Sequence, residues 1–190
     1  MRNKKDKGKT DKSRKARNKG EKDLIRFCII FTVLLVILLP SFSYFVVNSD
    51  IIMGTLEKFT ARISGFLLNL FQIKTTVNGK HLNSGNYSCV IVAECTGIFE
   101  MMILLAGIFA YPTSIRKKLW GILLGCSILY ATNIIRIILI VVVGNISFKA
   151  SELIHLWVWQ VINILIVIAV CLFWIEKVVK HEGKASLVHS

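Results

Sequence analysis

Long apolar runs alternate with short polar segments along this chain. Four runs come close to or reach the roughly 20 residues that a helix needs to cross a hydrocarbon core of about 30 Å: residues 24–47, 95–111, 119–143 and 155–175. The pattern predicts an all-α integral membrane protein with a bundle of four transmembrane helices. The first run continues past Pro40 without a good cleavage site, so we interpret it as a retained anchor and not as a signal peptide.

A more mixed pattern separates the first two runs, over residues 48–94. Apolar residues of segment 51–72 recur near the helical period, but charged residues interrupt them, which is typical of a helix on a membrane surface. Asn78-Gly79 favours a tight turn between two short extended pieces, and residues 87–92 are suited to a third strand. We therefore expect an extracytoplasmic amphipathic helix and a small β-hairpin insertion ahead of the second span.

The charge distribution indicates the topology. The formal net charge is +13 at pH 7, and residues 1–26 hold twelve Lys or Arg against four Asp or Glu. The turn 112–118 holds three basic residues and no acidic one. Because basic segments stay in the cytoplasm, we expect both termini there, in a multi-pass protein of the plasma or inner membrane. The chain then divides into a disordered basic cytoplasmic tail, a membrane domain and a cytoplasmic C-terminal tail, over residues 1–23, 24–179 and 180–190.

Ionisable residues inside the apolar runs are functional candidates, because such groups are expensive in a bilayer. Arg136 interrupts the third run, and Asn133 lies three residues earlier on the same helical face. Counting 1.5 Å per residue from the basic inner ends of the helices places Cys95, Arg136 and His155 at about 31, 27 and 33 Å. Three helices thus deliver a thiol, a guanidinium and an imidazole to one outer layer.

These three groups suffice for acyl transfer from a peptide bond. A thiolate attacks the carbonyl carbon, an imidazole transfers a proton to the departing amine, and a guanidinium stabilises the oxyanion. One Cys, one His and an Arg that repels cations make a poor zinc site, so we expect no metal and no cofactor. The basic N-terminal segment lacks interleaved aromatic residues, so we expect no nucleic-acid partner.

The surroundings of Cys95 leave alternatives open. A helix N-terminus stabilises a thiolate, whereas the adjacent Glu94 disfavours one unless its carboxylate turns toward Arg136 or a backbone donor. Cys89, the other cysteine on the outer side, either forms a disulfide with Cys95 or stays free. Arg136 alternatively pairs with a lipid phosphate, and His155 alternatively belongs to an interfacial aromatic belt.

With these residues in hand, the chain resembles the exosortase/archaeosortase family of membrane-embedded cysteine transpeptidases, whose short members include an exosortase H-like group. The resemblance covers roughly residues 24–179. It rests on three short motifs in order along the chain: Glu94-Cys95-Thr96-Gly97, Asn133-Ile134-Ile135-Arg136-Ile137, and His155 at the start of the last span.

The resemblance implies an enzyme that cleaves C-terminal sorting signals of exported, membrane-anchored proteins. It implies transfer of the new C-terminus, through a Cys thioester, to a lipid or glycan precursor at the cell surface. Cys95 is then the nucleophile, Arg136 the oxyanion stabiliser and His155 the general acid or base, on the extracytoplasmic side. The same motifs supply supporting or substrate-binding candidates: Glu94, Thr96, Gly97 and Asn133. We interpret Thr96-Gly97 as the small-residue path by which a substrate backbone approaches Cys95.

Two other functions remain open. A non-catalytic membrane assembly or transporter subunit would use Arg136 to pair with an acidic residue on a partner helix. A thiol-disulfide enzyme would use Cys89 and Cys95, although their spacing is not Cys-x-x-Cys.

Overall fold

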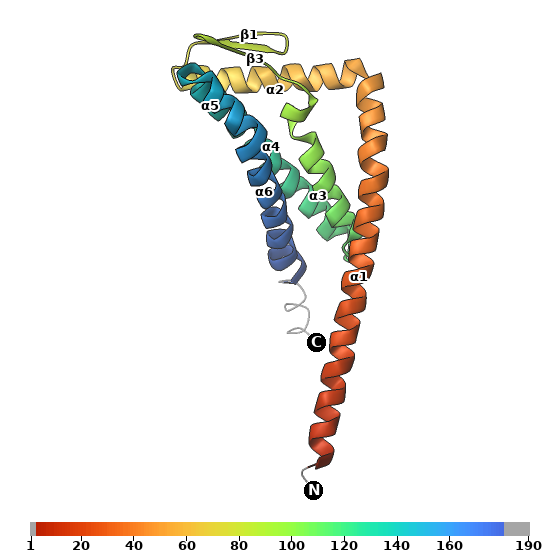
Figure 1. The fold of residues 1–190 in the computed structure, drawn as a ribbon. Helices are drawn as coiled ribbons and strands as arrows, with labels where there is room; N and C mark the ends of the chain where they lie inside the picture. The colour runs from red at the N-terminus through yellow and green to blue at the C-terminus, as the bar shows by residue number, and fades with distance from the viewer. Residues whose placement is uncertain (1–2, 181–190) are drawn as a thin grey trace.

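The computed structural model describes residues 3–180 and is built mainly of helices (Figure 1). Residues 181–190 of the expected C-terminal tail lie outside the described residues. Along the chain the elements are α1 Asn3–Asn48, α2 Asp50–Leu70, β1 Thr75–Asn78, β2 His81–Ser84, β3 Tyr87–Val90, the 3-10 turn η1 Ala93–Thr96, α3 Ile98–Ala110, α4 Ile115–Ile146, α5 Phe148–Leu153, the π-helical η2 Ile154–Val158, α6 Trp159–Trp174 and the π-helical η3 Ile175–Lys180.

Within residues 3–180, three helical stretches are long and apolar enough to cross a membrane: Glu21–Tyr44, Ile115–Ile146 and Phe148–Lys177. The second expected span is shorter than predicted, because α3 has only 13 residues, about 20 Å at 1.5 Å per residue. Gly97, with a φ of 76°, precedes this helix, and Tyr111, in an extended conformation before Pro112, follows it. The expectation of four full-length spans is therefore not met by α3.

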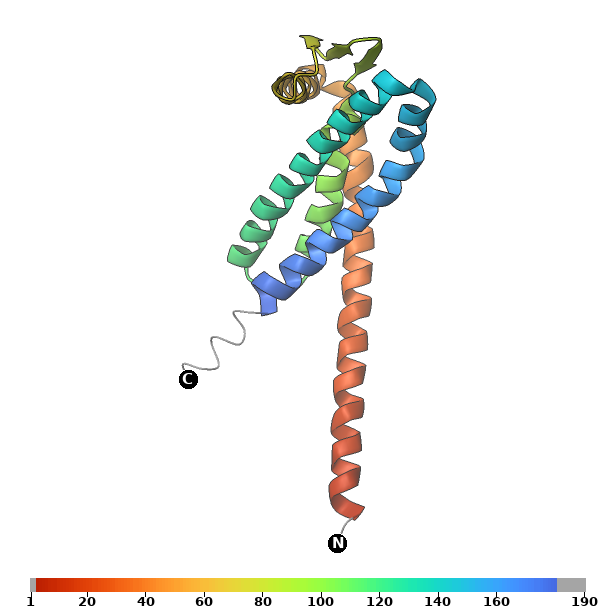
Figure 2. The same ribbon diagram turned by 90° about the vertical axis from the view of Figure 1, so that its left-hand side faces the viewer.

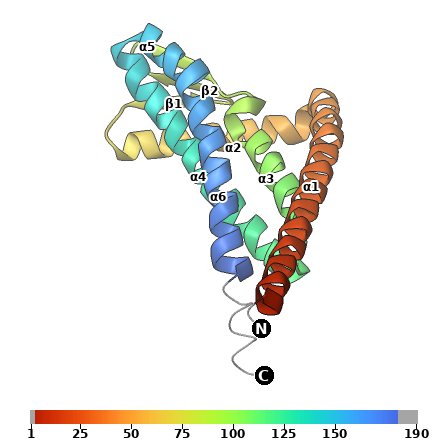
Figure 3. The ribbon, with the colours of Figure 1, turned by 60° about the horizontal axis from the view of Figure 1, so that its bottom comes forward.

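α1 begins at Asn3, so helix occupies the segment for which we expected a disordered tail. Lys and Arg, which are frequent in this segment, have high helix propensity. No residue in the most apolar window of α1 is buried. Figures 1 and 3 show this helix beside α3, where Phe42 packs edge-on against Phe99 at 5.6 Å between ring centroids. α1 is therefore attached to one side of the bundle and not enclosed by it.

The segment between α1 and α3 covers one end of the bundle (Figure 2). α2 crosses this end, and β1, β2 and β3 form an antiparallel sheet of three strands above it, with turns at Gly79 and Gly85 in the left-handed region. Leu68 of α2, Leu82 of β2 and Val141 of α4 pack in one buried cluster. The expected helix and hairpin are thus present, with the third strand, but the position of α2 at a membrane surface stays a prediction.

A second buried cluster holds α3, α4 and α6 together at the opposite end. It contains Leu104 and Ile108 of α3, Leu129 of α4 and Trp174 of α6. The indole N–H of Trp174 donates to the carbonyl oxygen of Lys117 at 2.9 Å. α4 runs through both clusters, so it connects the covered end of the bundle to the opposite end.

Candidate active site

Cys95 lies in η1, the short turn between the sheet and α3. Its side chain is 8% exposed, and its backbone N–H donates to the carbonyl oxygen of Val92 at 2.8 Å. Gly97 has a left-handed conformation and separates this turn from α3, which begins at Ile98. The prediction of a helix that starts at Cys95 is therefore wrong, and the thiol does not occupy the first turn of α3.

Asn133 of α4 fixes the position of the Cys95 turn. Its side-chain amide donates to the carbonyl oxygen of Cys95 at 2.5 Å. A Cβ atom on Gly97 would lie 3.2 Å from the Cβ of Asn133, closer than most side chains approach. The hydroxyl of Thr96, itself buried, donates to the carbonyl oxygen of Ala93 at 2.6 Å. Asn133 thus fills the space beside Gly97, so Thr96-Gly97 holds the turn against α4 and is not an open path for a substrate.

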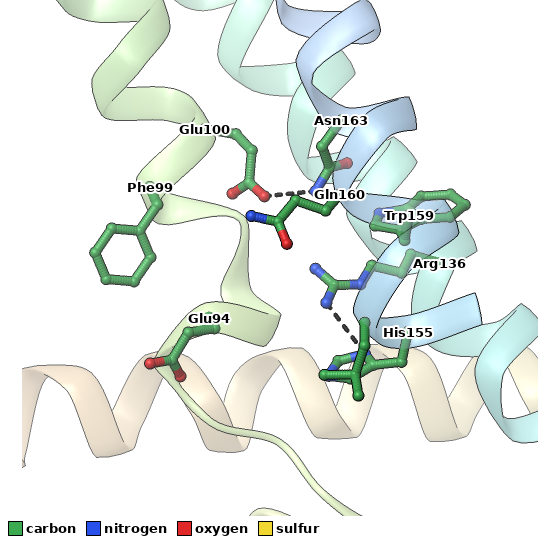
Figure 4. Close-up of a pocket in the computed structure, with 9 residues that line it drawn as sticks. Glu94, Phe99, Glu100, Arg136, His155, Trp159, Gln160 and Asn163 are labelled. Atoms are coloured by element: carbon green, nitrogen blue, oxygen red, sulfur yellow. Dashed lines mark hydrogen bonds between the residues drawn. The ribbon is translucent and has the colours of Figure 1, made fainter. Parts of the chain in front are cut away.

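Arg136 and His155 are in direct contact (Figure 4). Arg136 is 7% exposed on α4, and its Nη2 lies 3.1 Å from Nδ1 of His155, in the π-helical η2. A guanidinium has only donors, so Nδ1 accepts this hydrogen bond and the neutral ring carries its proton on Nε2. The contact therefore fixes one tautomer of His155 and leaves an N–H on the other side of the ring.

Two cavities meet at His155. The larger, of about 330 Å³, we call the polar cavity; its lining is Glu94, Phe99, Glu100, Arg136, His155, Leu156, Trp159, Gln160 and Asn163. The smaller, of about 120 Å³, we call the apolar cavity; its lining is Tyr87, Cys89, Val90, Ile91, Val92, Cys95, Ile137, Ile140 and His155. Arg136 therefore lines one cavity and Cys95 the other, with His155 between them.

Glu94 is exposed and lies across the polar cavity from Arg136. In Figure 4 its carboxylate points away from the guanidinium. Of the two orientations that would relieve its effect on the thiol, the one toward Arg136 is therefore not adopted.

Glu100 and Asn163 line the polar cavity but were not singled out from the sequence. The side-chain amide of Asn163 donates to Oε1 of Glu100 at 2.6 Å, and the buried Oε2 has no hydrogen-bond partner among the described residues. The sequence contained a signal for both. Glu100 is an ionisable residue within an apolar run, as Arg136 is, and Asn163 lies eight residues after His155, on the same helical face.

Cys89 and Cys95 are both free thiols that line the apolar cavity. Burial raises the pKa of the Cys89 thiol to about 11, and the neighbouring Cys95 adds to this shift. Cys89 is therefore protonated at neutral pH, whereas a thiolate is the nucleophile in both acyl transfer and disulfide exchange. This protonation disfavours Cys89 as the reactive cysteine and weakens the thiol-disulfide alternative.

Comparison with known proteins gave one match. The model of the family described as transmembrane exosortase (Exosortase_EpsH) matches residues 19–175 of this chain. The matched part contains the Cys95 turn, the contact between Arg136 and His155, and both cavities. Neither the search of curated proteins nor the search of solved structures gave a match.

Proposed function

The chain belongs to the transmembrane exosortase family, and we propose that it cleaves the C-terminal sorting signals of exported proteins and transfers them to a cell-surface acceptor. Family membership supports a membrane transpeptidase or protease role. The observation that carries the proposal is the 3.1 Å contact of Arg136 with His155, a residue that shares a cavity with Cys95.

In the proposed first step, the peptide lies in the apolar cavity with its carbonyl carbon against Cys95. When the guanidinium of Arg136 moves from Nδ1 of His155 to the carbonyl oxygen of the peptide, Nδ1 takes the thiol proton, and the sulfur bonds to the carbonyl carbon. Arg136 donates to the oxyanion where the two cavities meet. The C–N bond then breaks, His155 passes the proton to the departing amine, and a thioester to Cys95 remains.

In the second step, an acceptor attacks the thioester carbon. Its proton goes to His155, the C–S bond breaks, and the proton returns to the sulfur, so Cys95 regains its thiol. His155 thus transfers protons in both steps, which suits a residue that lines both cavities. Asn133 and Gly97 act through Cys95, because they hold its turn against α4.

We also propose that the catalytic end of the bundle faces outward, with the N-terminus in the cytoplasm. The basic N-terminal segment and the turn 112–118 lie at the end of the helices opposite the sheet, which supports this orientation (Figure 1). On α2, the apolar Phe59 and Phe66 are exposed beside Lys58 and Arg62. A helix that turns apolar side chains outward is suited to the surface of a bilayer. The substrate, with its own transmembrane helix, would then present its signal at this level.

The test is co-expression of the full chain with a protein that carries a candidate sorting tail. Cys95→Ala should reduce cleavage by about 10³-fold or more, and Arg136→Gln by about 10²- to 10³-fold, since one oxyanion donor is lost. His155→Ala should lower the rate by about 10²- to 10⁴-fold. Matched controls are Cys126→Ala, in the first half of α4 and outside both cavities, and Arg62→Gln, exposed on α2.

Each variant is compared at equal amounts in the membrane fraction. Normal processing by Cys95→Ala would refute the enzyme and favour the membrane-subunit alternative. Loss of processing in Arg136→Gln alone, with Cys95→Ala active, would favour a role of Arg136 in pairing with a partner helix.

A further inference from the structure

The two cavities that meet at His155 differ in chemical character. Around Cys95, the apolar cavity is lined mainly by aliphatic side chains, whereas two carboxylates and two carboxamides line the polar cavity. A transpeptidase handles two substrates in turn, and both must reach the same proton-transfer group. Because the donor peptide must lie against Cys95, the polar cavity is left for the second substrate, an inference that rests on the proposed function.

The formal charges of the polar cavity favour a cationic ligand. Glu94 and Glu100 contribute two negative charges and Arg136 one positive charge, and Arg136 already donates to His155. Glu100 is held in place by Asn163, and its Oε2 is free to accept a hydrogen bond. The Glu100 carboxylate is therefore a fixed, negatively charged hydrogen-bond acceptor in the cavity wall.

Trp159 gives an independent indication that this cavity is built for a ligand. The indole is 7% exposed and lines the cavity, yet its N–H has no hydrogen-bond partner among the described residues. Buried indole N–H groups usually find a partner. Trp157, two residues earlier, is 74% exposed, so the burial of Trp159 is not a general property of the tryptophans in this segment.

We propose that the polar cavity binds the acceptor of the second step, and that this acceptor is a primary amine held by Glu100. The amine arrives as an ammonium and gives one proton to the Glu100 carboxylate. Its nitrogen then bonds to the thioester carbon while the bond to the Cys95 sulfur breaks. The new amide nitrogen loses a proton to His155, which protonates the sulfur, and Glu100 releases its proton to water.

The experiment compares two nucleophiles that act on the same thioester. The full chain, in phosphatidylcholine vesicles with a tail-bearing substrate at pH 7, receives either ethanolamine, which is an ammonium, or hydroxylamine, which is mainly neutral. Glu100→Gln should raise the ethanolamine concentration for half-maximal transfer by roughly 10- to 100-fold, the loss expected for a hydrogen bond between charged groups. The hydroxylamine value should change far less.

Because both nucleophiles attack one thioester, a defect in folding or in the first step affects both and cancels in the comparison. Asn163→Ala leaves the carboxylate in place without its anchor, so it should shift the ethanolamine value in the same direction by less. Glu152→Gln removes a carboxylate that is exposed and outside the cavity, and it should shift neither value.

The amine site would be overturned if Glu100→Gln shifted the half-maximal concentrations of both nucleophiles equally. It would also be overturned if neither Glu100→Gln nor Asn163→Ala shifted the ethanolamine value. Such results, together with normal cleavage, would leave the proposed function intact, whereas wild-type protein that cleaves nothing would refute both. Vesicles of phosphatidylethanolamine without soluble amine identify the source. A lipid-linked product indicates a headgroup amine, and a product formed only with added ethanolamine indicates a soluble one.

Discussion

The two ends of the helical bundle are built from different contacts, although α4 runs through both. Near its start, Gly121 packs against the indole of Trp174, and Gly125 against Leu104. Fifteen residues after Gly121, about 22 Å along the helix, α4 instead carries the buried Arg136. The first part of α4 thus joins helices by close packing, whereas the later part carries Asn133 and Arg136, the polar side chains of the candidate active site.

Hydrogen-bond satisfaction separates the same two ends. The buried side-chain atoms that lack a partner among the described residues belong to Ser64, Glu100, Asn133, Arg136 and Trp159. At the opposite end, the buried Trp174 donates to a backbone carbonyl. Unpaired buried polar groups cost free energy unless a ligand pairs with them. These unpaired atoms therefore lie at the catalytic end, where a bound ligand would pair with them.

Adding a methyl group at Gly121 should break the packed end and give the largest effect on stability. Its Cβ would lie 2.5 Å from the indole nitrogen of Trp174, which holds the bond to Lys117. Gly121→Ala should destabilise the protein by up to about 3 kcal/mol through overpacking. Thermal unfolding in detergent, followed by tryptophan fluorescence, measures the change.

Gly54→Ala is the matched control, because its added Cβ meets nothing within 4 Å. It should stabilise α2 by about 0.5–1 kcal/mol through helix propensity. Processing per folded molecule should be unchanged in Gly121→Ala. A large loss of processing in well-folded protein would show that the two ends are not as separate as their contacts indicate.

Gly97→Ala, at the catalytic end, should have the next-largest effect on stability. It combines the cost of a left-handed conformation, about 1 kcal/mol or more, with the close approach of Asn133. Displacement of the Cys95 turn should lower processing by about tenfold or more, as expected when a reacting group moves by a fraction of an ångström to 1 Å.

Gly79→Ala isolates the conformational part of that cost. Gly79 also has a positive φ, 63°, but an added Cβ there meets nothing within 4 Å. The two variants should therefore lose similar backbone free energy, and only Gly97→Ala should lose processing. Equal processing in both would argue against a role of the Asn133 contact in positioning Cys95.

Much of this arrangement followed from counting along apolar helices. The rise per residue and the basic inner ends predicted that Arg136 and His155 lie at one level, and their side chains meet at 3.1 Å. The count misjudged the region of Cys95, because it assumed a continuous helix through Gly97. Sequence periodicity has no means of registering a single left-handed residue that ends one turn and starts another helix.

The pairing of side chains in the polar cavity could not be predicted from the sequence, for a different reason. The pairing of Glu100 with Asn163 joins α3 to α6, and the two residues are 63 positions apart in the sequence. A lone carboxylate in an apolar run signals a polar site, but only the packed structure identifies its partner. The fate of Thr96-Gly97 is similar, since the contact with Asn133 depends on how α4 crosses the turn.

The smallest expected effect on processing concerns Cys89, the thiol that we expect not to react. With a pKa of about 11, the Cys89 thiol is roughly a thousandth ionised at pH 8 and a tenth at pH 10. Its alkylation by iodoacetamide, mapped by mass spectrometry, should accelerate about tenfold per pH unit across that range. In denaturant the ordinary pKa of the thiol returns, so the alkylation rate should level off at a pH about two units lower than in the folded protein.

The same shift predicts the sign of a stability change. Folding raises the pKa of the Cys89 thiol. The contribution of this thiol to the free energy of unfolding is therefore fully present below about pH 9 and is lost as the pH rises toward 11. At pH 8 the Cys89 thiol is neutral and takes no part in the proposed chemistry, so Cys89→Ser should retain processing. A native alkylation rate already level by pH 9, together with loss of processing in Cys89→Ser, would instead make Cys89 the reactive thiol of this end.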